Sequence, residues 1–502
     1  MGTGFAGRAS VGGHRGSSGP EMEDLGRAGR RLLRLGLGWV RAEEEATPAR
    51  VLAEHLGPEV ADFAAVGETW PDWEQVNLQA GLEAWLAEGG RTHRLLGLTG
   101  FQHQPFTLAD LAQPEAQLPW LKMGSVAMAT VASGPDGATR QCVRCGLYLV
   151  REGEVPIALL LRSADDRHGP DTVVALDALC ADTEVAERVI AEVRRSALDH
   201  NVFRGQVVSF AGQVFGPRRA SLRFVPRPHL TREGLVLPPG MLEEVEGQVV
   251  GVARHSERLR ALGLHLKRGL LLHGPPGTGK THTVRYLLSQ LREHTVVIVS
   301  GDTIHLVGQA CSIARALQPA LVVVEDVDLV ADARGQHPGQ HPLLFLLLNE
   351  MDGLDEDVDV TFLLTTNRAD ILEPALAARP GRVDLAVEIP LPDEECRRRL
   401  IQLYRGGLEL EPGAAEELAA GTEGVAASFI KELLRRAALT AAESSAEDGA
   451  LRVGSEQARA ARERLLGERS RLTRVLLGAE PAQTSEVGPE QGRDAWTGHG
   501  VG

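Results

Sequence analysis

The residues best suited to chemistry in this 502-residue chain form a glycine-rich run that fills every position of the pattern G-x-x-x-x-G-K-[ST]. The run, with the residue that follows it, is Gly274, Pro275, Pro276, Gly277, Thr278, Gly279, Lys280, Thr281 and His282. Glycines let the backbone turn around a triphosphate, so that amide groups and the next helix's N-terminus face negative charge. The lysine then reaches the β- and γ-phosphates, and the threonine hydroxyl ligates Mg²⁺. The pattern therefore predicts a nucleotide site.

Polar side chains also follow two apolar runs farther along the chain. Glu325 and Asp326 come after the β-branched run 321–324, and Asn367 comes after the run 360–364 and two threonines. The carboxyl edge of a parallel sheet is where a carboxylate that organises Mg²⁺ and one that activates water belong. An acidic pair is also a common helix N-cap, and asparagine a common turn residue. Their place downstream of the phosphate loop favours the catalytic interpretation.

Two arginines, Arg379 and Arg382, flank the Pro380-Gly381 turn. Such residues are poor core formers and good charge-bearing fingers for a phosphoryl group.

The elements that must position these residues follow from local patterns. The apolar run from Leu270 to Leu272 is typical of a buried strand that leads into the glycine-rich loop. The residues from Thr283 to Leu291 are predicted to form the helix that follows the loop. Together with the runs 321–324 and 360–364, they indicate an α/β core with a parallel sheet.

Residues 235–439 resemble the AAA ATPases, in the clade that contains proteasomal ATPases and membrane-protein remodellers. The residues that carry the resemblance are Lys280 and Thr281 for Walker A, Glu325 and Asp326 for Walker B, Asn367 for sensor 1, Arg379 and Arg382 for the paired arginine fingers, Asn349 to Leu354 for the inter-subunit signalling segment, and Gly424 to Ser428 for the turn that opens a lid helix. One extra residue after Pro374 leaves open which arginine is the principal finger.

The resemblance implies a P-loop NTPase core with a small helical lid, Mg²⁺-dependent ATP hydrolysis at subunit interfaces, and a homo-oligomeric ring, a hexamer, that remodels a protein client. By position, Glu325 takes the metal role with Thr281, and Asp326 or Glu325 activates water that Asn367 orients. The order Glu-Asp departs from the common Asp-Glu, and aspartate is shorter by one methylene, so hydrolysis could be slow or the roles exchanged.

A second departure concerns the central pore. Leu306 stands where family members carry the aromatic residue that grips threaded polypeptide, and the segment from Gly308 to Pro319 is shorter than usual. These differences argue against threading and keep an alternative open, a slow-hydrolysing, nucleotide-gated assembly scaffold. A third hypothesis, a DNA-processing ATPase, conflicts with the net charge of −15, because nucleic-acid binders present basic surfaces.

Composition sets the remaining limits. An apolar content of 43% supports a sizeable core, and no apolar run reaches the length of a membrane span. The N-terminus shows no signal-peptide pattern, so we expect a cytoplasmic protein. Five cysteines do not make a disulfide framework. Cys142 and Cys145 have the spacing of half a zinc site, but a strand with incidental cysteines is the favoured interpretation.

The predicted fold class is α/β, a P-loop NTPase core with a helical lid preceded by an α+β region. The predicted boundaries are 1–22 disordered, 23–121 helical, 122–230 an α+β adaptor or substrate-recognition domain, 231–392 the ATPase core, 393–477 the lid and a C-terminal helix, and 478–502 disordered. Trp70, Trp73 and Trp85 are interpreted as apolar anchors and not as a ligand box. His337 and His341 flank a Pro-Gly pair that argues against a helical metal site.

Overall fold

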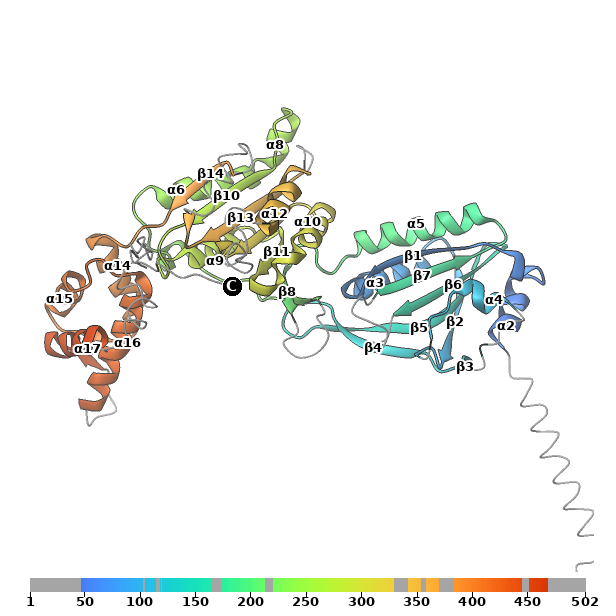
Figure 1. The fold of residues 1–502 in the computed structure, drawn as a ribbon, viewed down its shortest axis with the longest axis horizontal. Helices are drawn as coiled ribbons and strands as arrows, with labels where there is room; N and C mark the ends of the chain where they lie inside the picture. The colour runs from blue at the N-terminus through green and yellow to red at the C-terminus, as the bar shows by residue number, and fades with distance from the viewer. Residues whose placement is uncertain are drawn as a thin grey trace, which may run out of the picture.

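The structure is a computed structural model that describes residues 47–102, 104–113, 118, 120–163, 173–212, 220–328, 342–353, 358–369, 383–444 and 451–467. Three parts follow one another along the chain: an N-terminal domain from residue 47 to 201, a nucleotide core from 202 to 392, and a lid from 393 to 467. Figure 1 shows the core between the N-terminal domain and the lid.

The N-terminal domain is a single antiparallel sheet covered by helices on both faces. Its strand order is β1-β7-β6-β5-β2-β3, and β4 pairs with β5. Its elements are α2 (Pro48–Leu56), η1 (Val60–Asp62), β1 (Ala65–Pro71), η2 (Asp72–Glu74), α3 (Gln75–Ala87), β2 (Thr92–Thr99), α4 (Leu108–Ala112), β3 (Lys122–Gly124), β4 (Ala127–Ala132), β5 (Thr139–Glu152), β6 (Val155–Ser163), β7 (Val173–Leu179) and α5 (Thr183–Asp199).

Strands β5 and β6 are apolar on both sides because helices cover both faces of the sheet. Ile157 and Leu159 of β6 pack in one cluster with α3 and α5, whereas Ala158 and Leu160 pack in another with α2 and α4. Successive side chains of a strand point to opposite faces, so alternate residues enter different cores. Strands β3 to β7 and helix α5 give the range from 122 to 199 the mixed α and β content expected there.

The structure differs from the helical pattern predicted for 23–121. Within the described part of that range, α2, α3 and α4 are helices, but β1 and β2 are strands of the sheet. The partners of these strands come much later in the chain, since β1 pairs with β7 and β2 with β5. A short strand whose partner lies about fifty residues or more away leaves only a weak local pattern.

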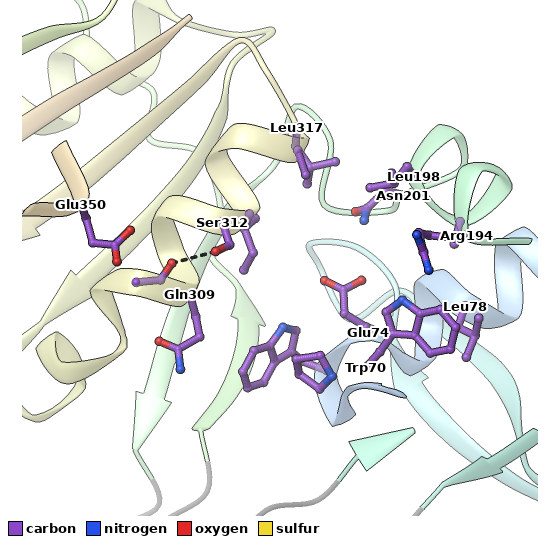
Figure 2. Close-up of a pocket in the computed structure, with 16 residues that line it drawn as sticks. Trp70, Glu74, Leu78, Arg194, Leu198, Asn201, Gln309, Ser312, Leu317 and Glu350 are labelled. Carbon is purple, nitrogen blue, oxygen red and sulfur yellow. Dashed lines mark hydrogen bonds between the residues drawn. The ribbon is translucent and has the colours of Figure 1, made fainter. Parts of the chain in front are cut away.

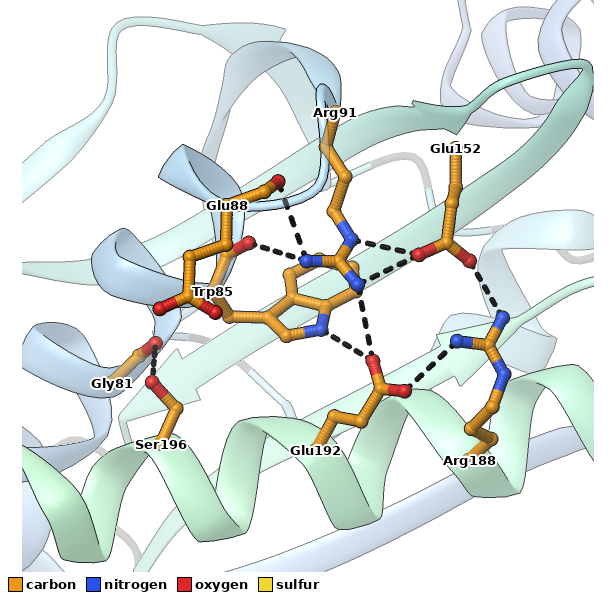
Figure 3. A network of polar contacts seen from close by, with 8 residues as sticks. All are labelled: Gly81, Trp85, Glu88, Arg91, Glu152, Arg188, Glu192 and Ser196. Atoms are coloured by element: carbon orange, nitrogen blue, oxygen red, sulfur yellow. Dashed lines mark hydrogen bonds and ion pairs between the residues drawn. The ribbon is translucent and has the colours of Figure 1, made fainter.

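A polar network ties the loop after α3 to α5 and the β5–β6 turn (Figure 3). The Arg91 guanidinium lies 4.2 Å from the centre of the Trp85 ring and donates to Glu152 at 2.7 Å and to Glu192 at 3.2 Å. Trp85 also donates to Glu192, at 2.8 Å. Hydrogen bonds from Arg188 and Arg91 hold the pKa of Glu152 below its ordinary value. Each charged group here has an opposite partner, so the network is structural.

The nucleotide core is a three-layer arrangement with a mostly parallel sheet. The strand order is β14-β10-β13-β12-β11-β8-β9. Its elements are β8 (Val207–Gly212), β9 (Ala220–Phe224), η3 (Arg232–Gly234), α6 (Met241–Glu246), the π-helical turn η4 (Gly247–Gly251), α7 (Val252–Arg254), α8 (Ser256–Ala261), β10 (Arg268–His273), α9 (Lys280–Gln290), β11 (Thr295–Ser300), η5 (Gly301–Leu306), α10 (Val307–Ala316), β12 (Ala320–Glu325), α12 (Pro342–Asp352), β13 (Val360–Thr366) and β14 (Leu385–Glu388).

Helices cover both faces of this sheet. Leu287 of α9 packs with Leu270 and Val323 on one face. On the other face, Ala314 of α10 and Leu348 of α12 pack with Val322. The α/β fold class with a parallel sheet is thus confirmed.

The core sheet begins before residue 231, where the sequence-based boundary was placed. Strand β8 pairs in parallel with β11, and β9 pairs with β8, so both extend the core sheet beyond β11. The same region contacts the N-terminal domain: the Trp73 and Phe210 rings lie edge to face at 5.5 Å, and the Val202 amide donates to the Asn77 side chain at 2.8 Å. Residues 202–212 and 220–224 therefore join the two domains.

The proline-containing segment 225–231, which links β9 to η3, contacts the core through Arg227. Its guanidinium donates to the carbonyls of Leu288, Leu291, Gly205 and His294, at 2.8 to 3.0 Å. Two of these carbonyls belong to the C-terminal end of α9, where backbone acceptors have no helical partner. The linker is thus anchored to the helix that follows the phosphate loop.

The lid is a small helical unit with its own apolar cluster, in which Phe429, Leu433 and Leu465 are fully buried or nearly so. Its elements are α14 (Glu394–Tyr404), β15 (Glu409–Leu410), α15 (Ala414–Ala420), α16 (Ala427–Ser444), β16 (Arg452–Val453) and α17 (Ser455–Gly467). In the described parts of the chain, no helix is long and apolar enough to span a bilayer.

Candidate nucleotide site

The glycine-rich run forms a tight loop between β10 and α9, and its glycines are required by their surroundings. Gly274 has a φ of 136°, and a Cβ there would lie 2.2 Å from the carbonyl oxygen of Ile389. Gly277 has a φ of 76°, and a Cβ there would lie 2.1 Å from the Ser428 hydroxyl oxygen. Only glycine tolerates both the positive φ and the close approach.

Helix α9 begins at the end of this loop without a side-chain cap. Its N-cap is Gly279, and no side chain of the described residues accepts a hydrogen bond there. The first backbone N–H groups of a helix lack intrahelical acceptors and carry a partial positive charge. The loop therefore offers the amide cradle that a phosphate group needs, as the sequence predicted.

Lys280 lies inside the cradle. Its ammonium group donates to the carbonyls of Gly274 and Pro275, both at 2.8 Å. Burial lowers the pKa of Lys280 to about 8, although the charges of Asp326 and Asp328 act in the opposite direction. A buried ammonium is stabilised by any anion that enters the loop, which suits a phosphate-binding role.

The two acids at the C-terminal end of β12, Glu325 and Asp326, contact different partners. Glu325 is the last residue of the strand, and its carboxylate hydrogen-bonds with the Thr281 hydroxyl. Burial and the neighbouring charge of Asp326 raise the pKa of Glu325. The structure thus brings together the two residues predicted as metal ligands, and a cation placed between them would relieve the carboxylate's desolvation.

Asp326 has a left-handed backbone, with a φ of 51°. Its amide donates to the Thr365 hydroxyl at 3.0 Å, and its carboxylate accepts a bond from the Asn367 amide at 3.4 Å. Aspartate tolerates this conformation better than most residues. The turn therefore brings the Asp326 carboxylate to the Asn367 side chain.

Asp328 holds Asn367 in place. Its side chain is buried and accepts bonds from the Thr366 hydroxyl at 2.9 Å and from the Asn367 backbone amide at 3.1 Å. The sequence by itself is equally compatible with a solvated acid and with a supporting residue at Asp328, and these two bonds show the supporting role. Sequence reasoning did not find Thr365 or Thr366, although both follow a buried strand and precede Asn367, which is the only available signal.

The lid touches the phosphate loop. The Ser428 amide donates to the Gly277 carbonyl at 3.2 Å, as expected for a turn near the nucleotide. The Ser428 hydroxyl oxygen is buried and has no hydrogen-bond partner in the described structure. Burial lowers the pKa of His282, and the charges of Arg285 and of the lid residue Lys431 lower it further. His282 therefore contributes a neutral ring where the loop meets the lid.

Several residues named from the sequence have no described position, and Leu306 is buried. Arg379, Arg382, His337, His341 and Leu354 lie outside the described residues. Leu306 is only 8% exposed and packs in the core with Val307, so this position presents no side chain to a pore.

Cys142 and Cys145 are buried and unpaired. Burial raises the pKa of Cys142 to about 11 and that of Cys145 to about 12, which opposes the thiolate form that zinc requires. Within the described residues, no group of three or more His, Cys, Asp or Glu side chains could hold a metal ion. The interpretation as incidental cysteines of a strand is consistent with these positions.

Comparison with known families agrees with this geometry. Residues 270–391 match the family model described as "ATPase family associated with various cellular activities (AAA)". This segment is an AAA domain. The AAA domain contains β10, the phosphate loop, the Walker B acids and Asn367, so the resemblance stated from motifs is confirmed. AAA domains bind ATP with Mg²⁺, and the amide cradle and the Thr281–Glu325 contact fit both groups.

Three curated relatives share this region. One is "ATP-dependent zinc metalloprotease FtsH 2" from Sphaerobacter thermophilus, 36% identical over 220 residues that make up 41% of this chain and 34% of that protein. Two others are named "ATP-dependent zinc metalloprotease FtsH". The protein from Acidimicrobium ferrooxidans is 32% identical over 47% of this chain and 38% of its own length. The protein from Akkermansia muciniphila is 33% identical over 48% and 31%. The chain thus spans about a third of the length of these relatives.

Proposed function

We propose that this protein hydrolyses ATP in its AAA domain and uses the turnover to remodel a protein partner. The observation that carries the proposal is the division of partners between the two acids. Glu325 contacts Thr281, while Asp326 contacts Asn367 at 3.4 Å. A site that hydrolyses a nucleotide needs one carboxylate for the metal and another for water. The geometry supplies both from consecutive residues.

Each residue then has a distinct task. Thr281 and Glu325 would hold Mg²⁺, which would supply positive charge to offset that of the phosphates. Lys280 leaves its carbonyl acceptors for the β- and γ-phosphates. Asp326 accepts a proton from the attacking water, and Asn367 orients that water. Asp328 keeps the Asn367 backbone in position through the 3.1 Å bond.

The assembled enzyme is proposed to be a homo-oligomeric ring, a hexamer by analogy with the family. In such a ring, Arg379 or Arg382 would reach the neighbouring subunit's nucleotide and stabilise developing charge. The client would be a protein, and the buried Leu306 favours remodelling without threading through an aromatic grip.

The test is steady-state ATP turnover of the assembled full-length protein, compared across three variants. Lys280→Ala should abolish nucleotide binding. Asp326→Asn should keep binding and lower kcat by about 10²-fold or more, because a positioned proton acceptor contributes that much. Asp326→Glu restores the usual length and should keep measurable turnover. Equal kcat for wild type and Asp326→Asn would refute the assignment.

A second candidate function is a nucleotide-gated assembly scaffold that binds ATP and hydrolyses it slowly. The left-handed Asp326, one methylene shorter than the usual glutamate, favours this alternative. Turnover below about one per hour in the assembled state would support it over the motor, since working enzymes approach ordinary rates. The Asp326→Asn protein can be trapped with ATP and the proteins that co-purify with it identified. A co-purifying protein client supports remodelling, whereas self-association alone supports the scaffold.

A further inference from the structure

A cleft of about 630 Å³ lies between the N-terminal domain and helix α10 of the core. One wall is formed by Trp70, Trp73 and Leu198, and the other by Ile313, Ala316 and Leu317. Figure 2 shows the two walls facing each other across this space. Cavities of this size with mostly apolar walls and few polar groups are typical ligand sites.

Two of the three charged side chains that line the cleft are acidic, Glu74 and Glu350. Arg194, its one lining cation among the described residues, is already paired with Glu68. Glu350 lies at the rim, 3.6 Å from Arg315. Glu74 accepts a bond from the Asn77 amide at 2.7 Å and has no cationic partner among the described residues. Figure 2 shows its carboxylate between the two walls.

The environment of Glu74 favours an incoming cation. Burial raises the pKa of this carboxyl, and the hydrogen bond from Asn77 offsets only part of that effect. A positive group placed beside the carboxylate would recover the lost solvation. The occupant that fits the cleft is therefore an apolar segment that carries basic residues.

The chain itself contains such a segment before its first described residue. Residues 25–41 contain five arginines and no acidic residue, interleaved with leucines and with Trp39. Thr47, where the described chain begins, is ten positions after Leu37, and a chain of that length extends up to about 35 Å. Strand β1 has seven residues and spans about 23 Å, and the cleft lies at its Pro71 end. The connection can therefore extend farther than the length of β1.

We propose that the cleft between α10 and the N-terminal domain is a docking site for residues 25–41 of the same chain. Leucine side chains of the segment would fill the space between Trp70 and Leu317, and its arginines would face Glu74 and Glu350. This proposal does not depend on ATP hydrolysis.

The experiment uses the full-length protein and a fluorescent synthetic peptide of residues 25–41. In a first variant, Leu33→Ser, Leu35→Ser and Leu37→Ser together release the internal segment, and the peptide is titrated by fluorescence anisotropy. We expect binding in the micromolar range and at least tenfold weaker binding of a scrambled peptide with the same composition. No binding below 100 µM (about 5.5 kcal/mol) overturns the proposal.

A matched pair of substitutions locates the binding site. Ala316 lines the cleft and is exposed on α10, so a larger side chain there does not displace buried residues. Added to the triple-serine variant, Ala316→Arg should weaken peptide binding about tenfold, and Ala316→Glu should not weaken it. Equal affinities for the two would place the peptide elsewhere and overturn the proposal.

Hydrogen–deuterium exchange of the wild-type chain distinguishes the source of the occupant. Residues 70–78 and 307–317 should exchange faster in the triple-serine variant than in wild type. The difference should be independent of protein concentration for an intramolecular contact. Protection that grows with concentration would assign the cleft to a second copy of the chain and overturn the intramolecular proposal. An unchanged exchange rate would also overturn it.

Discussion

The N-terminal domain and the nucleotide core are each built on a sheet of seven described strands, but they use buried charge differently. In the antiparallel N-terminal sheet, Arg91 lies against Trp85 and two glutamates that neutralise it. In the parallel core sheet, Lys280 has only carbonyl acceptors, and Glu325 lies beside a second acid. The comparison shows that charges satisfied within the fold stabilise it, whereas charges left partly unsatisfied are kept for a ligand.

The largest effect should come from removing the core's unsatisfied cation. Lys280→Met should weaken ATP binding about 10³-fold, or about 4 kcal/mol, because the phosphates lose their cation. The nucleotide-free variant should be no less stable than wild type, because it no longer buries an ammonium. Calorimetric titration with ATP and chemical unfolding measure the two effects. A large loss of stability in Lys280→Met would show that Lys280, like Arg91, is a charge that stabilises the fold.

The converse change is made in the N-terminal domain. Arg91→Ala should lower the free energy of unfolding by about 2 kcal/mol, because Glu152 and Glu192 lose the charged hydrogen bonds of a buried partner and keep only Arg188. ATP affinity should be unchanged. The control is Arg50→Ala, whose pair with Glu54 is exposed (58% and 66%) and should cost less than about 0.5 kcal/mol. Equal costs for the two arginines would contradict the structural assignment of the network.

The pH dependence of stability sharpens the contrast. Lys280 has a pKa of about 8 in the folded protein, below its ordinary value of 10.5. Between these values the unfolded chain binds more protons, so the stability of nucleotide-free wild type should rise with pH. The gain relative to Lys280→Met should be on the order of 1–2 kcal/mol between pH 7 and pH 10. Unfolding titrations of both proteins measure it, and parallel profiles would show that Lys280 is not the group responsible.

The smallest effect is expected at the cysteines. All five are buried and unpaired, and burial raises the pKa of Cys142 and Cys145 to about 11 and about 12. Ellman's reagent at pH 8 should label the native protein far more slowly than the unfolded chain, because thiolates are the reactive form. Added zinc should not change the melting temperature. A zinc-dependent rise of the melting temperature would indicate that Cys142 and Cys145 bind zinc.

Much of the nucleotide site was predictable because its residues are local to strand ends. The loop from Gly274 to Thr281, the acids after β12 and Asn367 after β13 each follow a buried apolar run, and parallel strands bring their carboxyl ends to one edge. The sequence left two roles open for Asp328, a supporting residue or a solvated acid, because the choice depends on bonds to Thr366 and Asn367, almost forty residues away. The strands β1 and β2 were missed for the same reason, since their partners are distant in sequence.

The sequence alone determined that this protein has an AAA nucleotide site, because a phosphate loop is a local motif whose backbone demands glycine at fixed positions. Only the tertiary structure decided which acid meets Thr281 and which meets Asn367, because that depends on the left-handed turn at Asp326 and on the packing of β12 beside β13. It also decided that β8 and β9 belong to the core sheet and that a cleft separates α10 from the N-terminal domain. These features arise from contacts between distant segments, which no local pattern encodes.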